Sequence, residues 1–168
     1  MQVKIIEYDP AFRLEAQNLM VELEEHLVRL DKDHLDIVSN DYREEMLAVD
    51  LQEIGQNNGK CFLAIVDDSV VGLIMGVERE YGVYDYLDYS CPRAGVITEL
   101  VVKSEYQGQN IGNVLTEKME CYFRRIGCKY SFVDVFAYNE PALHFYSKEG
   151  YHPRMITQIK KLSEEKTD

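Results

Sequence analysis

A glycine-containing segment between a strand and a helix carries the most definite chemistry in the sequence. Residues 98–115 have the pattern of a strand end, a short turn at Gln107-Gly108-Gln109-Asn110-Ile111-Gly112, and a helix start. Backbone N–H groups at such a turn are unpaired and a helix N-terminus is partly positive, so the segment could bind a phosphate group. It matches neither a Walker A loop nor a GxGxxG loop. From the residues alone, an ordinary strand-to-helix turn is the alternative.

A connection rich in acidic and tyrosine residues is a second candidate for chemistry. Carboxylates attract ammonium groups, and tyrosine rings can receive cations on their faces. Between residues 78 and 92 the acids Glu78, Glu80, Asp85 and Asp88 alternate with Tyr81, Tyr84, Tyr86 and Tyr89. The segment could therefore bind a cationic molecule, and a solvated loop is the alternative.

The periodicity of apolar residues predicts the elements that must position these segments. Spacings of three and four residues predict amphipathic helices over 11–29, 41–54 and 112–126, and a shorter helix over 140–148. Asp9 precedes Pro10 and can cap the first helix, on which Glu24 falls outside the apolar stripe. Runs rich in β-formers predict strands over 3–8, 61–66, 70–77, 95–102, 130–137 and 154–162.

The connections between these elements predict the sheet. Strands 61–66 and 70–77 form a hairpin, whereas 95–102 and 130–137 are joined by a helix and should be parallel, with a right-handed crossover. The expected fold class is α/β (α+β): one domain over residues 1–168 with a central mixed, twisted β-sheet flanked by helices. Residues 163–168 are expected to form a charged tail.

Composition excludes several classes of protein. The 168 residues suit one domain with its own core, and 46% of them are apolar, which excludes a disordered chain. A net charge of −12 disfavours nucleic acid and anionic membranes as partners. We see no membrane-spanning run, no signal peptide, and no zinc or redox spacing among the cysteines. We therefore expect a cytoplasmic protein with reduced cysteines and no metal site; a nucleophilic Cys91 is the rarer alternative.

Two segments together resemble one known family. The turn at 107–112 is similar to the acyl-CoA pyrophosphate loop, Gln/Arg-x-x-Gly-x-Gly/Ala, of the GNAT superfamily of N-acyltransferases. Residues 134–151 are similar to that family's strand, Asn-x-x-Ala, Phe-Tyr and Gly-Phe/Tyr signature. The two blocks have the expected order and spacing within an acyl-CoA-binding core of about residues 95–152. Asn110 stands where the family usually has its second glycine, and asparagine tolerates left-handed backbone angles better than other non-glycine residues.

The resemblance implies acetyl-CoA as cosubstrate and a set of contacts to it. The backbone of Leu100, Val101 and Val102 would pair with the pantetheine amides. Asn139 and Ala142 would line the pantetheine arm, with Tyr146 beside the sulfur. The pyrophosphate would lie on the segment Gln107, Gly108, Gln109, Asn110, Ile111, Gly112 and Asn113.

The implied reaction is acyl transfer from a thioester to an amine. It requires a neutral amine, a stabilised oxyanion and a proton for the departing thiolate. By resemblance, Tyr146 is the proton donor and Glu99 the base, while a backbone N–H near Val101 or Val102 stabilises the oxyanion. The alternatives are a tyrosine that only packs in the core and a glutamate exposed on a strand.

The predicted function is an N-acetyltransferase that moves an acetyl group from acetyl-CoA to a primary amine of a small molecule or peptide. Transfer would be direct, within a ternary complex. In this fold the 78–92 connection borders the acceptor cleft, so the expected substrate-binding residues are Glu78, Glu80, Tyr81, Tyr84, Asp85 and Asp88. A non-catalytic acyl-CoA-binding module is the alternative, and the resemblance also makes a homodimer plausible.

Overall fold

The computed structural model describes residues 2–162, so the tail predicted at 163–168 lies outside the described residues. The helices are α1 (Arg13–Leu30), α2 (Tyr42–Gln56), α3 (Ile111–Arg125) and α4 (Glu140–Lys148). The strands are β1 (Lys4–Glu7), β2 (Lys60–Val66), β3 (Ser69–Glu78), β4 (Ala94–Val102) and β5 (Tyr130–Val133). Three short 3₁₀ helices, η1 (Pro10–Phe12), η2 (Asp85–Leu87) and η3 (Ser104–Tyr106), lie between them.

The strands form one mixed sheet in the order β1-β2-β3-β4-β5. The pairs β1–β2, β2–β3 and β3–β4 are antiparallel. The pair β4–β5 is parallel, and its two strands are joined by α3. The β2–β3 hairpin turns at Asp67 and Asp68, whose φ angles of 47° and 61° are those of a tight turn between twisted strands. The mixed α/β fold expected from the sequence is thereby confirmed.

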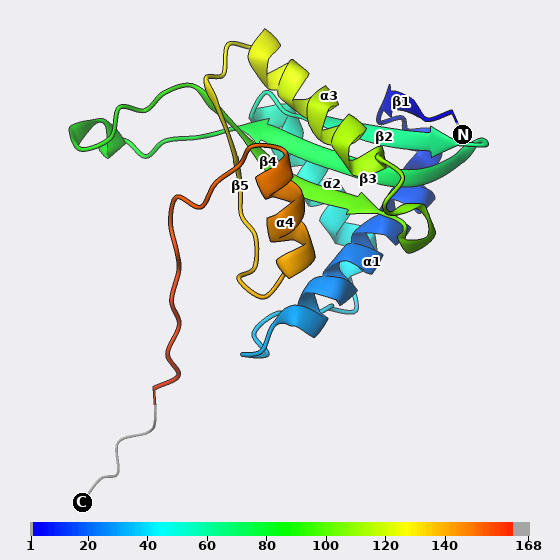
Figure 1. The fold of residues 1–168 in the computed structure, drawn as a ribbon, viewed down its shortest axis with the longest axis horizontal. Coiled ribbons are helices and arrows are strands. Elements are labelled where there is room, and N and C mark those ends of the chain that lie inside the picture. The colour runs from blue at the N-terminus through cyan, green and yellow to red at the C-terminus, as the bar shows by residue number, and fades with distance from the viewer. Residues whose placement is uncertain (1, 163–168) are drawn as a thin grey trace, which may run out of the picture.

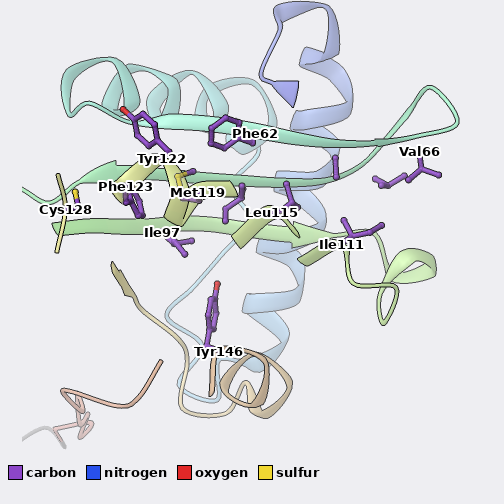
Figure 2. Close-up of a cluster of buried hydrophobic side chains, with 13 residues drawn as sticks. Phe62, Val66, Ile97, Ile111, Leu115, Met119, Tyr122, Phe123, Cys128 and Tyr146 are labelled. Carbon is purple, nitrogen blue, oxygen red and sulfur yellow. The ribbon is translucent and has the colours of Figure 1, made fainter. Parts of the chain in front are cut away.

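The helices cover both faces of the sheet (Figure 1). One buried cluster lies between the sheet and α1 and α2, and includes Leu19, Leu47 and Leu73. A second lies between the sheet and the pair α3 and α4 (Figure 2), and includes Leu115 and Tyr146. Within residues 2–162, no helix is both long and apolar enough to cross a membrane.

Most predicted elements lie where the periodicity placed them, because each has an apolar side to bury. Asp9 accepts a hydrogen bond from the N–H of Ala11 at 2.8 Å, so it caps the helical start as expected. Glu24 lies outside the apolar stripe of α1 but is nevertheless half-buried. It accepts a hydrogen bond from the Tyr42 hydroxyl, because α2 packs beside this side of α1.

The prediction of a strand over 130–137 is too long. β5 pairs with β4 only from Ala94↔Tyr130 to Ile97↔Val133 and ends there. The register of β4 with β3 shifts at this level, where Met75 faces Glu99 and Gly76 faces Ile97, leaving Thr98 as an extra residue. Such a bulge bends and twists a strand. β4 therefore diverges from β5, and residues 134–139 have no ladder to join.

The prediction of a last strand over 154–162 is wrong for this structure. These residues have no regular structure, and Met155, Ile156, Ile159 and Leu162 are between 60% and 82% exposed. Figure 1 shows the segment running away from the sheet. Strand-forming side chains are not sufficient, because a strand exists only when a neighbouring strand takes its backbone hydrogen bonds.

Candidate active site

A cleft of about 330 Å³ opens where β4 and β5 separate. One wall is β4 from Ile97 to Leu100, another is the chain from Val133 to Phe136, and α4 contributes Ala142 and Tyr146. Leu23 and Leu27 of α1 complete it. The cleft brings together Glu99, Leu100, Asn139, Ala142 and Tyr146, which the sequence assigned to one site.

Tyr146 is held by aromatic packing at the base of the cleft. Its ring lies 5.1 Å from that of Phe145 and 5.4 Å from that of Tyr151, both edge to face, and the side chain is 8% exposed. Figure 2 shows it standing on α4 with its hydroxyl directed toward β4. Burial, and then the nearby Tyr151 and Glu99, raise the pKa of Tyr146 above its usual value. The hydroxyl therefore keeps its proton through the neutral pH range.

Glu99 borders the same cleft from β4 and is half-buried. Its pKa is raised to about 8, first by burial and then by the negative charges of Asp50, Glu24 and Glu53. A carboxylate with a pKa this close to neutrality can take a proton from an ammonium group far better than an ordinary glutamate. Glu99 therefore has the protonation chemistry of a general base.

The backbone of β4 beyond the bulge faces the cleft at alternate residues. The Lys103 N–H donates to the Val71 carbonyl on β3 at 2.9 Å. Because antiparallel strands alternate in direction residue by residue, Val101 also faces β3, whereas Leu100 and Val102 direct their N–H and C=O groups to the other edge. The pairing of β5 with that edge ends at Ile97, so these groups are available to a ligand, except that the Val102 carbonyl already accepts a hydrogen bond from the Gln107 side chain.

The 107–112 turn presents a row of unpaired donors. In the described chain, the N–H groups of Gly108, Gln109 and Asn110 have no hydrogen-bond partner, and those of the first turn of α3 have none within the helix. The Gln107 and Gln109 amides donate to the carbonyls of Val102 and Glu105, both at 3.0 Å, which hold the turn in place. The arrangement suits an anion at the N-terminus of α3.

Two residues of the turn have left-handed backbones. Gly108 has a φ of +73° and Asn110 a φ of +67°. Asn110 thus adopts the conformation that a glycine would adopt, which explains how the departure from the family pattern is accommodated.

We expect Asn110→Gly to keep its affinity for CoA within about twofold, because the backbone geometry is unchanged. Asn110→Ala should lower the free energy of unfolding by about 1 kcal/mol, since alanine is disfavoured at positive φ. Urea unfolding and CoA titration measure the two quantities. Equal stability of the alanine variant and the original protein would show that the turn relaxes out of the left-handed conformation.

Two further residues assigned to the cofactor have protein partners. The Asn139 side chain accepts a hydrogen bond from the Ala142 N–H at 3.2 Å and so caps α4. The Asn113 amide donates to Glu149 at 2.6 Å and ties the start of α3 to the end of α4. Asn113 therefore fixes the spacing of the two helices that flank the site.

The 78–92 connection is divided between two places. Glu78 and Glu80 line a second cavity, of about 240 Å³, together with Glu53, Arg79 and Thr98. Glu78 is already paired there with Arg93 at 2.6 Å, which lowers its pKa. The remaining candidates lie on an arm that projects from the sheet (Figure 1). On that arm Tyr84, Asp85 and Asp88 are exposed, and the Tyr81 hydroxyl donates to the Pro92 carbonyl.

Sequence reasoning missed the side of the site formed by α1 and α2. Leu23 and Leu27 of α1 line the cleft, although the sequence marks them only as apolar residues of an amphipathic helix. Asp50 and Glu53 lie three residues apart and so share one side of α2, which was a usable signal. Nothing in the sequence says that this side of α2 faces Glu99. Cys91, the alternative nucleophile, is not among the residues lining either cavity.

Solved structures of low sequence identity share this fold. A mutant of the BH1408 protein from Bacillus halodurans has a TM-score of 0.80 at 17% identity, over 95% of this chain and 99% of that one. Glucosamine-6-phosphate N-acetyltransferase from Arabidopsis thaliana has a TM-score of 0.67 at 16% identity, over 97% and 100%. An aminoglycoside acetyltransferase from an uncultured soil metagenomic sample, in complex with sisomicin, has a TM-score of 0.63 at 20% identity, over 96% and 97%.

A match at the family level covers most of the chain. No curated protein resembles the chain closely enough to count as a match. The model of the acetyltransferase (GNAT) family matches residues 20–151, which include the cleft, the 107–112 turn, Glu99 and Tyr146. The chain therefore belongs to the GNAT acetyltransferase family.

Proposed function

We propose that this protein is an acetyl-CoA-dependent N-acetyltransferase acting on a primary amine in the cytoplasm. The observation that carries the proposal is the juxtaposition of Glu99 and Tyr146 in the cleft between β4 and β5, next to a turn rich in free N–H donors. A base for the amine and a proton donor for the thiolate are the two groups that aminolysis of a thioester requires.

The residues present fit acetyl-CoA. The N–H groups at 108–113 would hold the pyrophosphate, because they converge at a helix N-terminus. The backbone of Leu100 and Val102 would pair with the amides of the pantetheine arm, at the edge that β5 leaves free. Ala142 and Tyr146 would then lie beside the arm and its sulfur.

The chain's own groups account for each proton. The Glu99 carboxylate takes one proton from the ammonium form of the acceptor, and the freed nitrogen forms a bond to the acetyl carbonyl carbon. A backbone N–H at the free edge of β4, that of Leu100 or that of Val102, would stabilise the oxyanion, and the other would remain for the pantetheine arm. As the C–S bond breaks, the sulfur keeps the electron pair and receives the Tyr146 proton. Tyr146 regains a proton from the nitrogen that becomes the amide, so one proton in total is released.

A direct assay tests the proposal. Purified protein with acetyl-CoA and a panel of primary amines should release free thiol, measured by absorbance with a thiol reagent, and mass spectrometry should find the acetylated amine. Binding of CoA without thiol release for any amine would favour the non-catalytic acyl-CoA-binding alternative.

The pH profile identifies the base. Because Glu99 must be ionised to accept a proton, kcat/KM for the amine should rise with pH through an apparent pKa near 8. Tyr146 titrates well above this range, so it does not account for the rise. In Glu99→Gln we expect this rise to disappear and kcat/KM at pH 8.5 to fall on the order of 10²-fold.

Glu99→Asp is the matched control, since it keeps a carboxylate at the same position. In Glu99→Asp, kcat/KM should still rise with pH, but all its values should be lower. If kcat/KM of Glu99→Gln rises with pH as in the original protein, the base is another group or water.

We expect a homodimer, as the family resemblance implies, and the exposed segment 154–162 supports it. β5 is an edge strand, and a second copy of the chain could supply a segment to pair with it. Light scattering after size exclusion should give twice the mass of the chain. Ile156→Lys combined with Ile159→Lys should give a monomer, whereas the control Thr157→Lys should not. If the wild-type protein is a monomer at about 50 µM, the expectation of a homodimer is contradicted.

A further inference from the structure

The arm between β3 and β4, residues 81–92, presents large apolar side chains to solvent. They are between 67% and 81% exposed, and they are Val83, Tyr84, Tyr86 and Leu87. None of the four lines either of the two cavities that the described residues form. Exposed apolar side chains that gather in one short segment are typical of a surface that contacts a partner, and aromatic residues are enriched at such surfaces. The arm is therefore a candidate interaction surface.

Contacts within the arm give it a defined shape. The Tyr81 hydroxyl donates to the Pro92 carbonyl at 2.6 Å, which joins the two ends of the arm. The rings of Tyr81 and Tyr89 pack with their centres 5.7 Å apart. At the tip, the Gly82 N–H donates to the Asp85 carboxylate at 2.9 Å. A surface that already has its shape loses less conformational entropy when it binds a partner.

The segment 154–162 is complementary to the arm in chemistry. It carries Arg154, Lys160 and Lys161 and no acidic residue. The arm carries Asp85 and Asp88 and no Lys or Arg. Two surfaces that bind each other present opposite charges around apolar side chains. The apolar side chains of the segment are aliphatic and between 60% and 82% exposed, and they are Met155, Ile156, Ile159 and Leu162.

Within one chain, the segment contacts the arm at its beginning. The Arg154 guanidinium lies 5.2 Å from the centre of the Tyr89 ring on the arm and 6.0 Å from that of Phe132 on β5. Figure 1 shows the arm (green) and the segment (orange to red) leaving the sheet in different directions. Residues 154–162 are all exposed. The segment therefore leaves the apolar side chains of its own arm uncovered.

We propose that the arm of one copy binds the segment 154–162 of a second copy, and that the arm of the second copy binds the segment of the first. This inference rests on the proposed function, since it names the surfaces through which the expected homodimer forms. The segment begins beside β5, the edge strand with which a second copy is expected to pair, so the two contacts are continuous.

Two-fold symmetry explains why the partner is a second copy of this chain. In a two-fold dimer, each surface of one copy meets its complement on the other, so the same contact is made twice. One chain carries both complementary surfaces and holds them apart. A second copy therefore covers both sets of apolar side chains on both chains.

Charge reversal tests this pairing. The arm variant is Asp88→Lys with Ser90→Lys, and the segment variant is Lys160→Glu with Lys161→Glu, all at exposed positions. In each variant the arm and the segment have net charges of the same sign. We therefore expect each variant alone to have the mass of one chain at about 50 µM, where the wild-type protein is a dimer. Asp85 is left unchanged because it holds the tip of the arm.

The decisive measurement is the mass of an equimolar mixture of the two variants. In the mixed pair both contacts again join opposite charges, so light scattering after size exclusion should give twice the mass of the chain. This recovery also shows that both variants are folded. The control is Glu44→Lys with Glu117→Lys, which reverses two exposed charges on α2 and α3 and should remain a dimer.

Each other outcome overturns the inference in a distinguishable way. A dimer that persists in either variant means that the copies meet through another surface. Variants that are monomers both alone and in the mixture mean that these charges do not act between copies. A wild-type monomer contradicts both the inference and the expected homodimer. Thiol release from acetyl-CoA by the wild-type protein is measured separately, so failure of the acetyltransferase proposal is not confused with any of these results.

Discussion

Tyr146→Phe should lower kcat by on the order of 10²- to 10⁴-fold while the affinity for CoA stays within about twofold. The substitution removes one hydroxyl that is directed toward β4 and leaves the ring packed between Phe145 and Tyr151. Without that proton the sulfur must depart as a thiolate. Steady-state thiol release and CoA titration measure the two quantities.

Tyr130→Phe is the control for loss of a tyrosine hydroxyl, because Tyr130 is 60% exposed on β5 and lies outside the cleft. It should keep the original kcat. If Tyr146→Phe also keeps it, Tyr146 is a packing residue, or thiolate departure is faster than the step that limits turnover.

Gly112→Asp should reduce the affinity for CoA on the order of 10²-fold, because it adds a negative charge in the first turn of α3, beside the N–H groups proposed to hold the pyrophosphate. A Cβ at this position would lie 3.3 Å from the Phe145 ring, which is tighter than an ordinary contact, so the ring must give by a few tenths of an ångström to admit any side chain. Calorimetric titration with CoA measures the change, and circular dichroism checks that the helix is intact.

Gly112→Asn separates charge from bulk, since asparagine has the shape of aspartate. It should lose markedly less affinity than Gly112→Asp. Equal losses in the two variants would mean that size alone is responsible, and unchanged affinity in both would place the pyrophosphate elsewhere.

The conformation of the 107–112 turn was predictable because its determinants are local. Gly108 and Asn110 are residue types that tolerate positive φ, glycine because it has no Cβ, and free N–H groups follow from the start of any helix. The helix containing Tyr146 was predictable for the same reason, from the local spacing of its apolar residues over 140–148, and in the structure Asn139 caps its start. A resemblance to known motifs then added the roles of Glu99 and Tyr146, which no local rule contains.

Strand lengths were less predictable, because a strand is completed by its neighbour. The bulge at Thr98 ends the β4–β5 ladder, so residues 134–137 do not continue β5 despite their β-forming side chains. Residues 154–162 have no partner strand within the described chain, and their β-forming side chains alone produce no strand.

By itself, the sequence determined the order of the helices and of the first five strands, the mixed sheet, the 107–112 turn and the positions of Glu99 and Tyr146 within them. Only the tertiary structure decided that α1 and α2 place Glu24, Asp50 and Glu53 behind Glu99. The physical reason is that periodicity encodes which side of a helix is apolar, whereas the partner of a polar group depends on how two helices pack across a sheet. The burial and the neighbouring charges that raise the pKa of Glu99 are therefore properties of the fold.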